Sequence, residues 1–149
     1  MKQKSTKLIT FLLAFFALTL VLPSCEKDDN DPDPTPASIE GLWIGTYKVD
    51  GQPQWGEQYY SLIIKPDGTV INDTKGLNVQ YLAIGNWTLT GNAFTCNTEV
   101  VYGSSFNLGS TQTHTATFDK TTGTIANGIW TDVDTPGHNT GTFTMTKVK

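Results

Sequence analysis

The chain contains no arginine, and its ten basic residues are all lysines. Proteins that bind nucleic acid or other phosphates usually present a basic patch in which arginine side chains hold the phosphate oxygens. The formal net charge is −4, so acids outnumber bases. The sequence therefore disfavours a nucleic-acid or phosphate partner, and it disfavours attachment to an anionic surface through basic residues.

Cysteine and helical periodicity are also scarce. Cys25 and Cys96 are the only two cysteines. Cys96 lies in a strand-like segment, and a cysteine nucleophile needs a neighbouring base, of which the chain offers two histidines. We interpret Cys96 as a small buried residue. No run after residue 36 has the periodicity of an amphipathic helix, so the crossover helices that parallel strands need are not expected.

The N-terminus has the pattern of an export signal. Lys2, Lys4 and Lys7 precede an apolar run from residue 8 to residue 22 that only two threonines interrupt. This run is shorter than the roughly 20 apolar residues of a comfortable membrane span, and its length is typical of a signal peptide. We expect residues 1–24 to direct export.

The apolar run ends in Leu22-Pro23-Ser24-Cys25. This segment resembles the lipobox of bacterial lipoproteins, in which a small residue precedes an obligatory cysteine. The resemblance implies that Cys25 receives a lipid and becomes the first residue of the mature chain. Acyl chains hold a protein on a membrane at roughly 0.8 kcal/mol per buried CH₂. The alternatives are a secreted protein in which Cys25 is incidental and an uncleaved membrane anchor.

Residues 25–36 form an acidic, proline-rich tether. After Cys25 they contain five carboxylates, one lysine and three prolines, and such a segment stays extended and solvated. Its Lys27-Asp28-Asp29 step resembles the surface-export signal of Bacteroidetes lipoproteins, which implies a lipid-anchored domain on the outer face of the outer membrane. A linker that is merely soluble is the alternative. From Cys25 onward, seven lysines oppose fourteen acids, a net charge of −7.

Residues 37–149 are long enough for one domain with its own core. β-branched and aromatic residues alternate with polar ones, and Gly or Asn recurs at short intervals, which predicts short strands joined by turns. We expect eight strands, near Gly41–Lys48, Gln58–Lys65, Thr69–Asp73, Gln80–Leu89, Ala93–Tyr102, Gln112–Asp119, Thr124–Thr131 and Thr140–Lys147.

The connections predict how these strands pair. Lys65-Pro66-Asp67-Gly68 has the residues of a tight turn, and Thr90-Gly91-Asn92 and the segment before Gly123 close two more hairpins. Short connections make consecutive strands antiparallel neighbours. One apolar face per strand fits a sandwich or a barrel, and closure into a barrel removes the exposed edges. The predicted fold is an all-β, eight-stranded, antiparallel up-and-down barrel.

Gly41-Leu42-Trp43 resembles the Gly-x-Trp motif that opens lipocalins. The pattern occurs again at Gly85-Asn86-Trp87 and Gly128-Ile129-Trp130. In lipocalins the first tryptophan plugs the closed end of an eight-stranded barrel, which implies this role for Trp43. A C-terminal helix, disulfides and an arginine to stack on Trp43 are missing, so the cup is expected to be shallow or filled by side chains. Further pieces resemble the small lipocalin-like lipoproteins of Bacteroidetes: Ile64–Val70, Gly85–Leu89, Ala116–Asp119, Thr122–Ile125 and Gly141–Thr144.

Catalytic and metal-binding patterns are weak. His114 alternates with apolar residues, so it is expected to point inward as a hydrogen-bonded core or pocket residue. Asp132, Asp134 and His138 have the donor types of a cation site, but a solvated turn is the favoured interpretation. The sequence has no nucleophile elbow, no phosphate-binding glycine loop and no inward pair of carboxylates. We expect no enzyme and no cofactor.

The aromatic residues carry the functional hypothesis. Trp55 lies in the long first loop, which in a lipocalin-like barrel covers the mouth, either as an exposed contact or folded back as a plug. The leading hypothesis is a barrel that binds a small apolar or amphipathic ligand. In the alternative the barrel is filled, and loops with Trp55 and Val101-Tyr102-Gly103 bind a glycan or an envelope protein. The candidate ligand-binding residues are Tyr47, Trp55, Tyr60, Leu62, Tyr81, Ala83, His114, Phe118 and Phe143.

Overall fold

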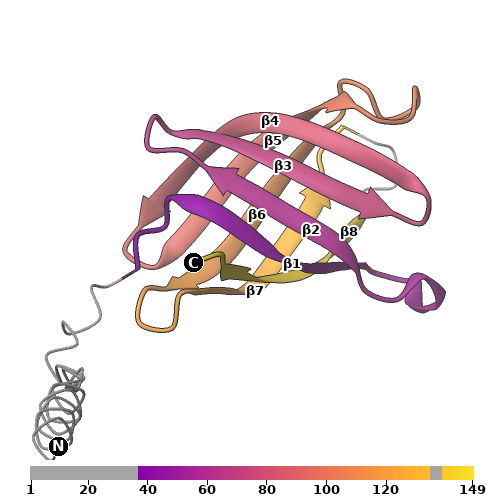
Figure 1. The fold of residues 1–149 in the computed structure, drawn as a ribbon. Helices are drawn as coiled ribbons and strands as arrows, with labels where there is room; N and C mark the ends of the chain where they lie inside the picture. Colours follow the sequence, from indigo (N-terminus) through magenta and orange to yellow (C-terminus); the bar gives the residue numbers. More distant parts are fainter. Residues whose placement is uncertain (1–36, 135–138) are drawn as a thin grey trace, which may run out of the picture. The chain divides into compact units, whose positions relative to one another are not determined.

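Eight antiparallel strands form a closed barrel in which each strand pairs with the next and β8 returns to β1 (Figure 1). The structure, a computed structural model, describes residues 37–134 and 139–149. It confirms the predicted all-β, up-and-down barrel. The strands are β1 Gly41–Val49, β2 Gln58–Ile64, β3 Thr69–Gly76, β4 Val79–Thr90, β5 Ala93–Tyr102, β6 Thr111–Asp119, β7 Thr124–Asp132 and β8 Thr140–Lys147.

The export signal, the Cys25 lipidation site, the tether and His138 lie outside the described residues. Within the described part of the chain, no helix is both long and apolar enough to span a membrane. The described residues belong to one compact unit, Thr35–Lys149.

Most strand ends agree with the sequence prediction to within one residue, and two elements differ by more. Strand β3 continues three residues beyond the predicted end at Asp73, because Thr74, Lys75 and Gly76 pair with β4 in register. Its polar side chains hid this continuation in the sequence. The first loop contains a one-turn 3-10 helix, η1 (Pro53–Trp55), with a proline in its first turn, where a missing N–H costs little.

The alternating direction of the strands gives the barrel two different ends. The tight turns at residues 65–68, 91–92 and 120–123 lie at the end where β1 begins. The longer connections at 50–57 and 103–110 and the β3–β4 turn lie at the other end, where β7 ends and β8 begins (Figure 1). We call the first the closed end and the second the mouth.

The closed end is filled by apolar side chains. Trp43 is fully buried, and its Nε1–H donates a hydrogen bond of 2.6 Å to the carbonyl oxygen of Ile39. The ring of Phe118 meets it edge-on at 5.8 Å between centroids. The backbone N–H of Ala37 donates to the Lys120 carbonyl, so the segment before β1 lies across this end. Trp43 therefore closes the barrel floor, as the Gly-x-Trp pattern implies.

Glycines permit the strands to approach closely elsewhere in the Gly-x-Trp pattern. A Cβ added to Gly85 would lie 1.8 Å from the Asn97 carbonyl oxygen, and one added to Gly128 would lie 2.5 Å from that of Phe143. No Cβ atom can lie 1.8 Å from a carbonyl oxygen, so glycine is required at position 85, where β4 runs beside β5.

Candidate ligand-binding site

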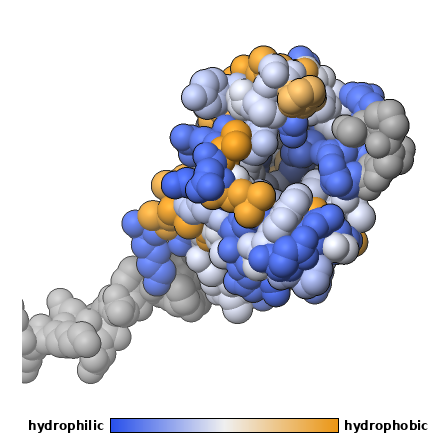
Figure 2. All heavy atoms as spheres, turned by 90° about the vertical axis from the view of Figure 1, so that its right-hand side faces the viewer, coloured by the Kyte–Doolittle hydropathy of each residue, from blue (hydrophilic) through white to orange (hydrophobic). Residues whose placement is uncertain are grey.

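A cavity of about 260 Å³ opens at the mouth of the barrel. Figure 2 looks onto this end of the molecule and shows a hollow near its centre, with hydrophilic, intermediate and hydrophobic residues around it. Ligand pockets usually measure about 300–1,000 Å³, so this cavity suits a small molecule or one end of a larger one. It is lined by Tyr47, Val49, Trp55, Gln58, Tyr60, Asn72, Thr74, Gly76, Leu77, Val79, Tyr81, Ala83, Val100, Asn107, Gln112, Trp130, Asp132 and Asn139.

A buried hydrogen-bonded layer forms the floor of the cavity. The Tyr60 hydroxyl lies 2.6 Å from Nδ1 of His114, whose Nε2 lies 3.1 Å from the Thr98 hydroxyl. Asn72 also hydrogen-bonds to Tyr60 and donates to the Ser61 carbonyl. Both ring nitrogens of His114 are thus satisfied, as a buried polar ring requires. Their partners are hydroxyls and not a carboxylate, so His114 lacks the orienting acid of a hydrolase triad.

Burial keeps this layer neutral. It lowers the pKa of His114 to about 4 and raises that of Tyr60 well above its usual range, because a charge there would lose its contact with water. A neutral imidazole has one donor and one acceptor, which the two hydroxyls can match in either tautomer. The layer therefore separates the apolar closed end from the cavity without placing a charge inside the barrel.

Aromatic rings form one wall. Tyr47 packs against Tyr60 at 5.6 Å and meets Trp130 nearly edge-on at 6.0 Å between ring centroids. The Trp130 Nε1–H donates to the Lys48 carbonyl at 3.1 Å, which fixes the orientation of its ring. Burial raises the pKa of Tyr47, with a smaller contribution from Tyr81. Tyr47 and Tyr81 are half-buried, so the rings of these two residues border the cavity.

Neutral polar groups form another part of the lining. Gln112 Nε2 donates to one carboxylate oxygen of Asp132 at 2.8 Å, and Asn139 Nδ2 donates to the other at 3.0 Å. Gln58 accepts a hydrogen bond from the Leu77 backbone N–H at 2.7 Å through its side-chain oxygen. Gln58 is therefore held by its side-chain oxygen, and Gln112 and Asn139 are held by their side-chain nitrogens. The other polar atom of each amide is left for further hydrogen bonds.

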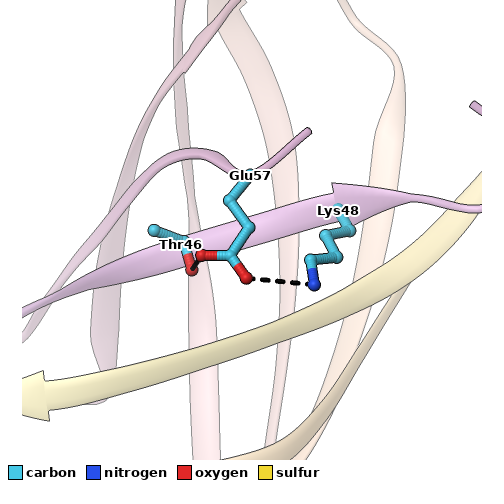
Figure 3. Close-up of polar contacts among 3 residues, drawn as sticks. All are labelled: Thr46, Lys48 and Glu57. Atoms are coloured by element: carbon cyan, nitrogen blue, oxygen red, sulfur yellow. Dashed lines mark hydrogen bonds and ion pairs between the residues drawn. The ribbon is translucent and has the colours of Figure 1, made fainter. Parts of the chain in front are cut away.

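The first loop brings Trp55 to the rim. Trp55 ends η1, lines the cavity and is 38% exposed, so it is neither a buried plug nor a fully free side chain. The loop is tied to the outer wall by Glu57, whose carboxylate lies 3.0 Å from the Lys48 ammonium and accepts a hydrogen bond from Thr46 (Figure 3). The hydrogen bond from Lys48 and its positive charge lower the pKa of Glu57.

The nine candidate residues fall into two groups. Tyr47, Trp55, Tyr60, Tyr81 and Ala83 line the cavity. The other four point inward as predicted but lie in the packed interior outside the cavity lining. These four are Leu62, His114, Phe118 and Phe143. Leu62 lies opposite Trp43 on the neighbouring strand, and Phe118 packs on the Trp43 ring. His114 and Phe143 pack against Tyr60.

Sequence reasoning missed most of the polar lining. Asn72 and Thr74 alternate with buried Val70 along β3, so the period of two places them on the inner face. The predicted strand includes Asn72 but ends before Thr74, and neither residue is among the predicted ligand-binding residues. Gln58 and Gln112 stand at the mouth ends of their strands, where the sequence alone cannot distinguish a lining residue from a solvated one.

Asp132 and Asp134 differ in burial, and the third candidate donor, His138, lies outside the described residues. Asp132 is buried and hydrogen-bonded to the two amides above, whereas Asp134 is exposed and accepts a hydrogen bond from the Thr111 hydroxyl. In residues 37–134 and 139–149, no three His, Cys, Asp or Glu side chains gather as a metal site would require.

The interpretation of Cys96 is confirmed. It is 1% exposed in the core, and burial raises the pKa of its thiol to about 12.

Comparison with protein-family models, with curated proteins and with solved structures finds no match to this chain. The barrel and its cavity are therefore the basis for any functional argument.

Proposed function

We propose that this protein is a lipid-anchored lipoprotein whose barrel binds a small amphipathic molecule through its mouth. The observation that carries the proposal is the cavity of about 260 Å³, whose lining includes aromatic rings, side-chain amides and one hydrogen-bonded carboxylate. An interior built only to fill itself would place apolar side chains throughout, as the closed end does. Half-buried rings beside amides instead offer a surface that a ligand with one apolar side and one polar side would complete.

The direction of the chain is consistent with an anchor at Cys25. The first described residue, Ala37, contacts the β6–β7 turn at the closed end. The tether therefore joins the barrel at the end opposite the mouth, so an anchored barrel keeps its mouth at the end remote from the attachment point. Incorporation of labelled palmitate by cells that express the full chain, and its loss in Cys25→Ala, tests the anchor. Digestion of intact cells by added protease tests exposure on the outer face.

Filling the cavity tests the binding proposal. Ala83 lines the cavity and is 2% exposed, whereas its neighbour Ile84 points outward and is 43% exposed. Ala83→Phe should fill part of the cavity and lower the affinity for a bound ligand at least tenfold. Ile84→Phe changes the same strand on its outer face and should leave affinity unchanged. The measurement is native mass spectrometry of the full chain isolated from cells, together with titration of an apolar fluorescent probe.

A reproducible bound mass that Ala83→Phe loses and Ile84→Phe keeps would support the proposal. A chain that carries no small molecule and takes up no probe would contradict it, provided that both variants fold.

A second candidate function rests on the β5–β6 loop. Phe106 is 96% exposed, and Tyr102 and Leu108 are 62% and 52% exposed at the same end of the barrel. Apolar side chains gathered on one loop are typical of a protein-binding surface. In this function the loop binds an envelope protein and the barrel is a scaffold. Phe106→Ser should then abolish capture of that partner from solubilised envelopes, and Ala83→Phe should not affect it.

A further inference from the structure

The charge of the cavity lining limits the class of ligand. Among the described lining residues, Asp132 is the only charged one, and none is a lysine. The two lysines on strands near the mouth point outward: Lys48 bonds to Glu57 on the outer wall, and Lys75 is exposed. A carboxylate or phosphate group in this cavity would lose water and find no cation among the described lining residues to replace it. Fatty acids, phosphorylated compounds and acidic sugars are therefore poor ligands.

The polar groups are arranged as both donors and acceptors. Asp132 accepts from the amide nitrogens of Gln112 and Asn139, so the carbonyl oxygens of both side chains are left as acceptors. Gln58 is held by its oxygen, so its amide nitrogen is left as a donor. The Tyr81 hydroxyl adds a group that can do both. Hydroxyl groups are the natural partners of such a set, because each hydroxyl donates one hydrogen bond and accepts others.

The aromatic wall supplies the other half of the recognition. The ring of Tyr47 contacts those of both Tyr60 and Trp130, and Trp55 adds a fourth ring at the rim. Flat aromatic faces bury apolar C–H groups over a large area. A molecule with hydroxyls around its edge and C–H groups on its faces would use both kinds of lining. A plain acyl chain would instead cover several amides without forming hydrogen bonds, which is costly.

We propose that the ligand is a neutral sugar ring, which the aromatic wall contacts by stacking while the Gln58, Gln112 and Asn139 amides bind its hydroxyls. This inference rests on the proposed function and deepens it by naming the ligand class. The cavity volume fits one ring, which is either a free monosaccharide or the terminal residue of a glycan.

The test compares sugars that share a ring but differ in charge. Glucose, galactose, mannose and N-acetylglucosamine are the neutral probes, and glucuronate and glucosamine are the charged ones. The full chain is held in a polyoxyethylene detergent, which has no sugar or ammonium headgroup. Binding is followed by calorimetry and by the fluorescence of Trp55 and Trp130. We expect at least one neutral sugar to bind, and its acidic relative to bind at least tenfold more weakly.

Three variants connect binding to the named residues. Gln112→Met keeps the shape of the side chain and removes its amide, and Tyr81→Phe removes only a hydroxyl. Each should weaken sugar binding about three- to tenfold, the usual effect of one lost neutral hydrogen bond. Neither should weaken binding of an apolar fluorescent probe. Gln80→Met is the matched control, because Gln80 is exposed and bonds to Asp73 on the outer wall. It should change neither measurement.

The outcomes separate the inference from the proposed function. If the apolar probe binds and no sugar does, the sugar inference is overturned and the proposed function stands. Binding of tetramethylammonium in preference to neutral sugars would also overturn it, in favour of a cationic ligand. If nothing binds, both fail. A glycan array then identifies the source: binding of both glycans and the monosaccharide indicates a terminal residue, and binding of the monosaccharide alone indicates a free sugar.

Discussion

The two halves of this barrel are built from the same strands, but the interior of one is a packed core and the interior of the other contains a cavity. In the closed half, Trp43, Phe94 and Ile125 are fully buried in the apolar core. In the mouth half, Tyr47 and Tyr81 are half-buried around a cavity. Each strand passes through both halves, so alternation alone does not decide which interior forms. The decision lies in the side chains at inward positions, which are apolar toward the closed end and include tyrosines and amides toward the mouth.

The layer of Tyr60, His114 and Thr98 marks the change between the halves. Its groups are polar enough to border the cavity and yet fully hydrogen-bonded, so they also tolerate burial against Phe143. The comparison therefore predicts that substitutions toward the closed end act on stability and that substitutions toward the mouth act on binding.

The largest effect is expected for Trp43→Ala. Removing a fully buried tryptophan leaves a cavity and usually costs about 3–5 kcal/mol. The change also removes the hydrogen bond to Ile39 that holds the segment before β1. The free energy of unfolding in urea, followed by circular dichroism, measures this loss.

Trp55→Ala is the matched control, because it removes the same residue type from the mouth. Trp55 is 38% exposed, so its loss should change stability far less than the loss of Trp43 does. Its effect should appear in ligand affinity instead. Equal destabilisation by the two substitutions would mean that the halves do not differ in the way proposed.

The next effect is a pH dependence that His114 creates. Its pKa is about 4 in the folded protein and near 6.5 when unfolded, so between these values the unfolded chain binds a proton that the folded chain does not. Stability should therefore be constant above pH 6.5 and fall by about 3 kcal/mol as the pH falls to 4. The measurement is a series of urea unfolding curves across this range.

His114→Gln should remove this slope, because glutamine does not titrate and the surrounding Tyr60 and Thr98 stay neutral. The pKa values of Asp67 and Asp119 are lowered by hydrogen bonds from nearby N–H groups. Protonation of these two carboxyls reduces the stability of the fold only at lower pH, and it does so in both proteins. A slope of the same size in His114→Gln would assign the pH dependence to other groups.

The sequence predicted more of the fold than of the site. Strand ranges and turns followed from alternation and from Gly and Pro, because these act within a few residues. The inward direction of His114 and Phe143 followed from the same rule. An inward side chain either fills the core or lines the cavity, depending on its height along the barrel axis. That height is set by the register between strands that are distant in sequence. Leu62 and Tyr81 are both inward, but only Tyr81 reaches the cavity. The lining amides were missed for this reason.

The smallest effect is expected for Glu57→Gln at the outer wall of the mouth. The ion pair with Lys48 is exposed on both sides, and such pairs contribute little because water and salt screen them. We expect a slight loss of thermal stability at low ionic strength and none at high ionic strength, with Lys48→Met as the partner variant. If Glu57→Gln instead weakened ligand binding strongly at unchanged stability, the loop that carries Trp55 would have to be held in place for binding. The mouth would then depend on its outer wall, whereas the closed end depends only on its core.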